Sequence, residues 1–215
     1  MRLYAVADIH AKPSRIERVR AGVREYAPDI LVVAGDICNY VNPHGVFSLL
    51  NEIGIPVLAV LGNSDRPWHE RCLCRYENIT SLHMRQINIG GFSFSGISGA
   101  VPVPFRTRIA LREKALFEKA AHNISSETIL VVHPPPYGTL DRVIGRLCAG
   151  SRGVARLVAA RLPQLVLCGH IHEGTGIERI GSTLVVNCSI ADAANGAVID
   201  FDGPAGETAP AARMV

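Results

Sequence analysis

The chain has 215 residues, 48% of them hydrophobic and 19% charged, and its formal net charge is +3. No apolar run approaches the ~20 residues that a membrane span needs, and no block of Lys and Arg resembles one that tracks a phosphate backbone. These features argue against a membrane-spanning protein and give no case for a nucleic-acid binder, so we expect neither a membrane nor a nucleic acid as partner.

The length is enough for one substantial domain. We expect that domain to span residues 1–202, and the Gly-, Pro- and Ala-rich residues 203–215 to form a disordered tail. The chain begins with a strand-like segment rather than a leader-type hydrophobic one, so the expected location is the cytoplasm. The sequence gives no indication of the oligomeric state.

The first third of the chain alternates between strand-like and helix-like patterns. We expect, in chain order, a strand over 3–7, a helix over 14–26, a strand over 30–34, a helix over 45–53 and a strand over 57–61. The strands are continuous apolar runs, which are typical of parallel strands covered on both faces. In the first helix, apolar side chains recur at intervals of three and four and predict one buried stripe.

The remaining two thirds are richer in strands. Residues 66–82 are polar, and we expect them to be irregular. After them we expect a hairpin over 86–98, a loop over 100–106, a helix over 107–121, a strand over 128–132, a helix over 153–161 capped by Ser151, and strands over 165–168, 177–180, 183–188 and 197–201. Short glycine-bearing turns predict that the last strands are antiparallel neighbours. Two strand-rich halves predict two stacked sheets flanked by helices.

Polar side chains that can bind metal ions stand in five short clusters, and four of these follow directly on a predicted strand. The clusters hold Asp8 and His10 in AVADIH, Asp36 in VVAGDIC, Asn63 in AVLGNSD, His133 in LVVHPPP, and His170 with His172 in LCGHIH. Parallel strands bring such side chains to one edge, where open α/β sheets bind ligands. Each cluster alone is ordinary turn chemistry. Together, their imidazole, carboxylate and amide groups predict a hydrolytic site with two divalent metal ions.

The ordered series D-x-H, G-D, G-N-x-D, H and G-H-x-H resembles the motifs of the calcineurin-like metallophosphoesterase superfamily, from residue 3 to about residue 190. The H-P-P-P and C-G-H-I-H-E segments resemble its small bacterial and archaeal phosphodiesterase-type members. The resemblance implies an α/β fold, a four-layer α-β-β-α sandwich. It also implies that one metal ion is held by Asp8, His10 and His172, the other by Asn63, His133 and His170, and that Asp36 bridges them.

The resemblance implies a metal-dependent phosphoesterase. Its two divalent ions would be Mn first, with Fe, Zn, Co or Ni as alternatives, and a hydroxide bridging them would attack phosphorus. The expected substrate is a small phosphodiester such as a cyclic nucleotide. Asp36, Asn63 and His133 are the expected catalytic residues, and Asn39 and Arg66 are candidate phosphate contacts.

The third motif departs from the pattern of the superfamily. The usual G-N-H-D carries a histidine that protonates the leaving oxygen, and Ser64 stands in its place here. Serine is not a general acid at neutral pH, and such an acid typically contributes ~10²–10⁴-fold. Asp65 would lose its usual histidine partner. Either His69 or His83 could return to the site as a substitute acid, although we expect both at the surface.

Two readings of this departure remain open. A missing acid hurts substrates with poor leaving groups most, which favours a diesterase over a general phosphatase. Alternatively, the protein is a weakly active or inactive protein-binding scaffold on the same fold, as is the retromer subunit of the superfamily, which also lacks the histidine. Metal content would separate the two readings, because a scaffold has no physical need for seven competent ligands.

Overall fold

The structure is a computed structural model that describes residues 1–39, 43–99, 116–145, 147–203 and 209–215. In chain order its elements are β1 (Arg2–Val6), α1 (Pro13–Tyr26), β2 (Ile30–Ala34), α2 (His44–Asn51), β3 (Val57–Val60), α3 (His69–Leu73), β4 (Ile79–Ser81), β5 (Gln86–Ile89), β6 (Phe92–Ile97), η1 (Ala121–Asn123), β7 (Thr128–Val132), β8 (Arg142–Val143), β9 (Leu147–Cys148), α5 (Arg152–Arg161), β10 (Leu165–Cys168), η2 (His172–Gly174), β11 (Gly176–Ile180), β12 (Thr183–Asn187), β13 (Ala197–Asp200) and β14 (Ala211–Met214). No helix among them is long and apolar enough to cross a bilayer.

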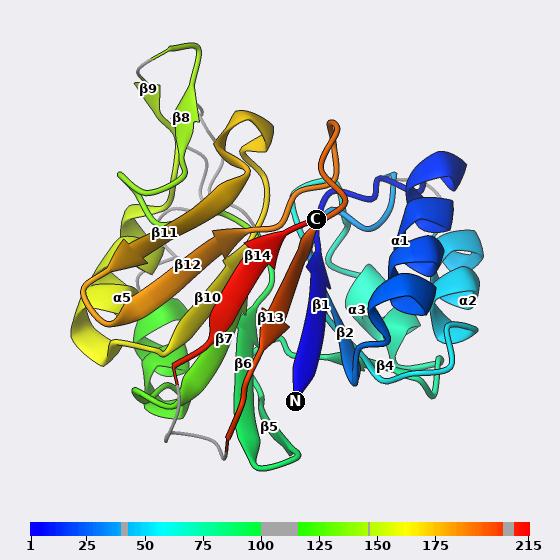
Figure 1. Cartoon of the computed structure of the whole chain (residues 1–215), viewed down its shortest axis with the longest axis horizontal. Coiled ribbons are helices and arrows are strands. Elements are labelled where there is room, and N and C mark those ends of the chain that lie inside the picture. Colours follow the sequence, from blue (N-terminus) through cyan, green and yellow to red (C-terminus); the bar gives the residue numbers. More distant parts are fainter. Residues whose placement is uncertain (40–42, 100–115, 146, 204–208) are drawn as a thin grey trace.

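Two six-stranded sheets form the centre of the described structure (Figure 1). The first has the order β14-β13-β1-β2-β3-β4, in which β1 to β4 are parallel and β13 and β14 are antiparallel. The second has the order β11-β12-β10-β7-β6-β5, with four parallel strands between antiparallel edges. The carboxyl ends of the parallel strands in each sheet therefore lie along one edge.

Three apolar layers hold the sheets and helices together. Side chains such as Leu3, Phe94 and Leu167 fill the space between the two sheets. A second cluster packs α1, α2 and α3 on the outer face of the first sheet, and a third packs α5 on the outer face of the second sheet. The predicted four-layer α-β-β-α sandwich is thereby confirmed.

The pairing of the last strands differs from the prediction. We expected antiparallel neighbours, but β10 and β12 are parallel and only β11 runs antiparallel to β12. The reason is that β11 turns back along the outer edge, so β12 returns between β11 and β10 in the direction of β10. The chain then leaves this sheet altogether, and β13 pairs with β1 of the first sheet. Turn residues are local and do not specify which sheet a strand joins.

Two segments expected to be irregular are ordered. The stretch 66–82 contains α3 and β4. The expected disordered tail ends in β14, where Arg213 pairs in register with Val198 of β13. Backbone pairing with β13 and the packing of Met214 against the core stabilise this strand. The small residues that precede it gave no indication of a strand. In the expected helix over 107–121, residues 116–120 are helical and 107–115 lie outside the described residues, as does the loop expected over 100–106.

Candidate metal centre

The seven predicted ligands come from loops at one edge of the sandwich. They follow β1, β2 and β3 of the first sheet and β7 and β10 of the second. The two sheets are joined at this edge, because Ala7 forms a parallel bridge with Ser189 and donates a backbone hydrogen bond to Cys188 O at 3.0 Å. The ends of β1 and β12 are thus fixed against each other directly beneath the site.

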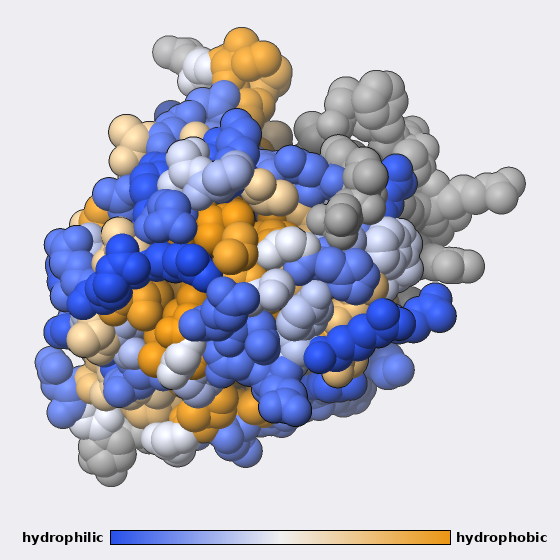
Figure 2. All heavy atoms as spheres, turned by 90° about the vertical axis from the view of Figure 1, so that its right-hand side faces the viewer, coloured by the Kyte–Doolittle hydropathy of each residue, from blue (hydrophilic) through white to orange (hydrophobic). Residues whose placement is uncertain are grey.

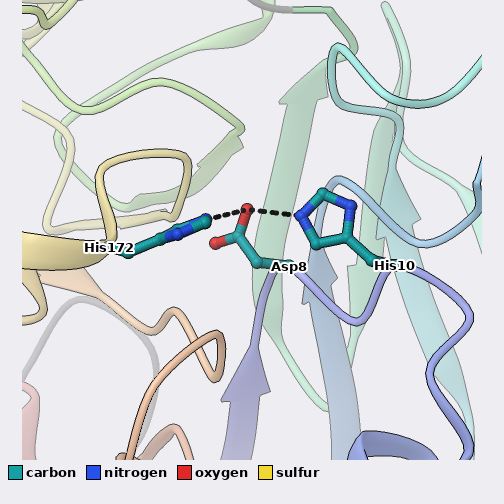
Figure 3. A group of neighbouring side chains, drawn as sticks. All are labelled: Asp8, His10 and His172. Carbon is teal, nitrogen blue, oxygen red and sulfur yellow. Dashed lines mark ion pairs between the residues drawn. The ribbon is translucent and has the colours of Figure 1, made fainter.

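One group of ligand atoms surrounds Asp8 from its solvent side. His10 and His172 lie on opposite sides of the Asp8 carboxylate (Figure 3). Asp8 Oδ1 is 3.9 Å from His10 Nε2 and 3.5 Å from His172 Nε2. Asp8 is fully buried, whereas the side chains of His10 and His172 are 20% and 37% exposed. The structure therefore brings together the three residues expected to hold one metal ion, with the histidines on the open side.

A second group lies deeper and is centred on His133. Its Nε2 is 3.4 Å from Asp36 Oδ1, 4.0 Å from Asp8 Oδ1 and 3.1 Å from Asn63 Oδ1. Its Nδ1 donates to Ala34 O at 2.8 Å, which directs Nε2 at the carboxylates. The ring of His170 lies 5.0 Å from that of His133, centroid to centroid.

Asp36 stands between the two groups. Its Oδ1 faces His133 Nε2, and its Oδ2 lies 3.7 Å from His10 Nε2. This is the position that a bridging carboxylate needs. Asp36 therefore faces both groups of donors, and Asp8 is also in reach of both.

The charges of the cluster shift its pKa values in opposite directions. Burial alone would lower the pKa of His133, but the carboxylates of Asp36 and Asp8 outweigh it and raise that pKa to about 9. Burial would raise the pKa of Asp36, but the neighbouring His133 lowers it. Burial and the charge of His133 lower the pKa of His170 to about 4, while contact with Asp8 raises the pKa of His172. In the metal-free protein, the proton on His133 compensates the neighbouring carboxylates, and a cation must displace it.

The donor set fits divalent cations. Asp8 Oδ1 is buried and has no hydrogen-bond partner in the part of the chain that the structure describes. Such an oxygen is costly unless something compensates it, and a cation shared with the histidines would do so. Asp8, Asp36 and His170 also have φ values of +63°, +51° and +70°, which residues other than glycine rarely adopt. Strain of this kind concentrates where a fold fixes side chains for binding.

Two glycines of the motifs are required because a carboxylate lies close to the backbone of each. A Cβ atom on Gly62 would collide with Asp36 Oδ1, and one on Gly169 would lie 2.8 Å from Asp8 Oδ2. Both carboxylates therefore occupy space that any side chain would take. This explains physically why Asn63 and His170 each follow a glycine.

The loops that carry the ligands are held by polar groups whose roles the sequence does not reveal. Ser64 donates from its backbone N to Asp36 Oδ1 at 2.7 Å and from its hydroxyl to Asp36 Oδ2 at 3.0 Å. Asp65, which lacks its usual histidine partner, accepts backbone hydrogen bonds from Ile37, Cys38 and Gly62 at 2.7–3.1 Å. It therefore ties the loop after β2 to the loop after β3.

Arg15 is a further residue that the sequence reading missed. Although it lies in α1, it is buried, and its guanidinium donates to Asp8 O at 2.7 Å and to Ala191 O at 2.6 Å. It holds the left-handed backbone of Asp8 against the loop after β12. An arginine in a surface helix carries no sequence signal of this role, because most such side chains are solvated.

The expectation that His69 and His83 lie at the surface was wrong. His69 is fully buried, and its Nδ1 accepts a hydrogen bond from the backbone N–H of Arg66 at 3.1 Å. His83 is half-buried, and its Nδ1 accepts from Ser98 N at 3.0 Å. Both rings are engaged in holding loops. Asn39 and Arg66 are exposed on the loops that follow Asp36 and Asn63, and their contact with phosphate stays a prediction.

Comparison with known proteins gives one family over most of the chain. The sequence model of the calcineurin-like phosphoesterase superfamily domain matches residues 1–197. An uncharacterized protein of Methanocaldococcus jannaschii is 29% identical over 207 residues, which cover 88% of each chain. A probable cyclic nucleotide phosphodiesterase of Synechococcus sp. is 24% identical over 179 residues, covering 81% of this chain and 69% of the relative.

A solved structure shares the architecture. The structure of a novel archaeal phosphodiesterase is similar with a TM-score of 0.59 and 14% sequence identity, and the match covers 100% of each chain. At this identity the likeness concerns the fold alone. The arrangement of layers is therefore shared beyond recognisable sequence similarity.

Proposed function

Because this chain belongs to the calcineurin-like phosphoesterase superfamily, we propose that it is a metal-dependent phosphodiesterase that hydrolyses a small phosphodiester. The observation that carries the proposal is the position of Asp36 between two sets of nitrogen and oxygen donors, beside a buried Asp8 oxygen that has no hydrogen-bond partner in the described residues. Such an arrangement suits two cations close together better than one.

In this proposal each group of donors holds one divalent cation. The ligands are Asp8, His10 and His172 for the first, Asn63, His133 and His170 for the second, and Asp36 for both. Mn is the first candidate, and Fe, Zn, Co and Ni suit the same donors. When bound, two such ions supply Lewis acidity and make hydroxide accessible near neutral pH.

The chain's own side chains orient the reaction. Ser64 fixes both oxygens of the Asp36 carboxylate, and Ala34 O fixes the ring of His133. Asn63 is exposed at the mouth of the site, so an incoming phosphoryl group meets its amide first. We propose that Asn39 and Arg66, on the adjacent loops, donate to phosphoryl oxygens.

The third motif supports a diester substrate. The Ser64 hydroxyl already donates its proton to Asp36, so it is not placed to protonate a leaving oxygen. His69 is fully buried, and its Nδ1 accepts a hydrogen bond from the backbone N–H of Arg66, so its ring is not placed to protonate a leaving oxygen either. Substrates that depend least on an acid are therefore favoured. A cyclic nucleotide is one candidate, and the similarity to the probable cyclic nucleotide phosphodiesterase of Synechococcus sp. supports it.

A Mn²⁺-supplemented assay tests the proposal. Bis-p-nitrophenyl phosphate and a panel of cyclic nucleotides should be hydrolysed faster than p-nitrophenyl phosphate. Asp36→Asn should abolish turnover, whereas Asp200→Asn should not, because Asp200 pairs with Arg2 away from the ligand loops. An inert, Mn²⁺-loaded wild-type protein across all diesters would end the proposal.

The scaffold alternative is favoured by Ser64 alone. It predicts metal content near zero in the purified protein, whereas the enzyme should retain about two equivalents after loading and desalting. The buried Asp8 oxygen that lacks a hydrogen-bond partner among the described residues argues for the enzyme, because a pure scaffold gains nothing from it.

A further inference from the structure

A small hairpin made of β8 and β9 projects from the body at the end of the molecule where the parallel strands end (Figure 1). Its tip carries Ile144, 87% exposed, and Leu147, 65% exposed. The hairpin forms an apolar knob at the top of the space-filling view (Figure 2). Large apolar side chains that stand together on a projection mark a site of interaction.

The backbone conformation at the tip does not favour an apolar, β-branched side chain, so turn formation does not explain the isoleucine there. Ile144 has a φ of +44° and Gly145 a φ of +79°. A β-branched residue is a genuine outlier in this region, whereas Asn or Asp would adopt it readily. The chain therefore keeps isoleucine at the tip in spite of the strain. Strained positions of this kind cluster at binding sites.

The base of the hairpin is rigid. The Asp141 carboxylate is buried and accepts backbone hydrogen bonds from Gly138 and Gly150, both at 2.9 Å. Tyr137 N donates to Ser151 O at 3.0 Å. The tip is thus held away from the body by its own base.

The charge of this segment is cationic. Residues 137–152 contain three arginines and one carboxylate, Asp141, which is 1% exposed. Arg152 packs its guanidinium 4.1 Å above the ring of Tyr137. Arg142 lies one residue behind the tip, where it lines a pocket with the exposed Glu173 and Glu178. Although these two carboxylates lie beside Arg142, the hairpin segment itself has an excess of cations, and an apolar tip with cations behind it matches the order of acyl chains and phosphates in an anionic bilayer.

We propose that the β8–β9 hairpin docks on an anionic membrane surface, with Ile144 and Leu147 among the headgroups and acyl chains and with Arg142 and Arg152 near lipid phosphates. The sequence predicts no membrane partner, mainly because it contains no spanning segment, but surface docking needs none. Because the hairpin projects from the end of the molecule where the parallel strands end (Figure 1), a docked molecule presents the ligand edge toward the lipid.

Co-sedimentation of the full chain with vesicles tests the proposal. Wild-type protein should bind vesicles that contain phosphatidylglycerol more tightly than pure phosphatidylcholine vesicles, and salt should weaken the preference. Ile144→Asn should lower binding about tenfold while raising thermal stability, because Asn accepts the positive φ. Leu147→Ser should lower binding by a similar factor without a change at the strained position.

Leu162→Asn is the matched control. Leu162 is also exposed, at 47%, and has a φ of +51° at the end of α5, so the same substitution relieves the same strain away from the hairpin. Its vesicle binding should equal that of the wild type. The proposal would be overturned if the wild-type protein bound neither type of vesicle, or if Ile144→Asn bound vesicles as tightly as the wild type. A lipid-free dimer that Ile144→Asn dissociates would overturn it too, by assigning the tip to a second copy. None of these measurements needs turnover, so they are independent of the proposed function.

Discussion

Removing one hydroxyl group, in Ser64→Ala, should weaken metal binding at the candidate centre. The substitution deletes the hydrogen bond from the Ser64 hydroxyl to Asp36 Oδ2 at 3.0 Å and leaves the backbone bond to Oδ1 at 2.7 Å. Asp36 is the carboxylate between both ligand groups, so a looser Asp36 affects both.

The size of the effect follows from the kind of bond that is lost. A hydrogen bond to a charged group contributes about 1.5–3 kcal/mol, and an outer partner of a metal ligand typically contributes 10–100-fold in metal affinity. Since Ser64 is only 5% exposed, water does not readily replace the hydroxyl. We expect Mn²⁺ affinity to fall about 10–100-fold, with the protein still folded.

Chelator competition at fixed pH measures this affinity directly. Ser81→Ala is the matched control, because the buried Ser81 hydroxyl also donates to a carboxylate, Glu70 Oε2 at 2.6 Å, that is not a predicted ligand. Equal Mn²⁺ affinity in Ser64→Ala and wild type would refute the argument that Ser64 positions Asp36. Ser64 would then mark only the absence of an acid.

Four other outcomes are expected. Ser64→His should raise monoesterase activity relative to diesterase activity, and an unchanged ratio in a folded, metal-loaded variant would count against the missing-acid argument. Mn²⁺ affinity should rise with pH up to about 9, where His133 loses its proton, and calorimetry in buffers of different ionisation enthalpy should show proton release on binding. In the metal-free protein, protonated His133 stabilises the fold because its pKa is raised. This contribution is complete below the ordinary pKa of 6.5 and is lost as the pH rises through about 9. Urea unfolding midpoints that stay constant across this pH range would contradict the prediction. Asp65→Ala leaves three buried N–H groups without their acceptor and should lower the free energy of unfolding by about 3 kcal/mol or more, while loss below about 1 kcal/mol in urea titrations would show that water replaces the carboxylate.

The residues that hold the ligand loops in place could not be predicted from the sequence. Ser64 reads as a lost acid and Arg15 as a solvated helix residue, yet one fixes Asp36 and the other fixes the backbone of Asp8. In the sequence Asp65 lacks its usual histidine partner, yet three backbone donors converge on it. Such roles depend on which loops meet in space, and nothing in the local pattern specifies that.

The sequence by itself determined the strands that precede the predicted ligands, the seven candidate donors and the layers of the sandwich. Burial of a strand requires a continuous apolar run, and a polar ligand must stand where the run ends, so both are written locally. Only the tertiary structure decided that β12 is parallel to β10, that the last residues form β14, and that Asp36 stands between the two ligand groups. The reason is physical: sheet partners and carboxylate neighbours are chosen by packing between segments far apart in the chain, which short-range periodicity does not record.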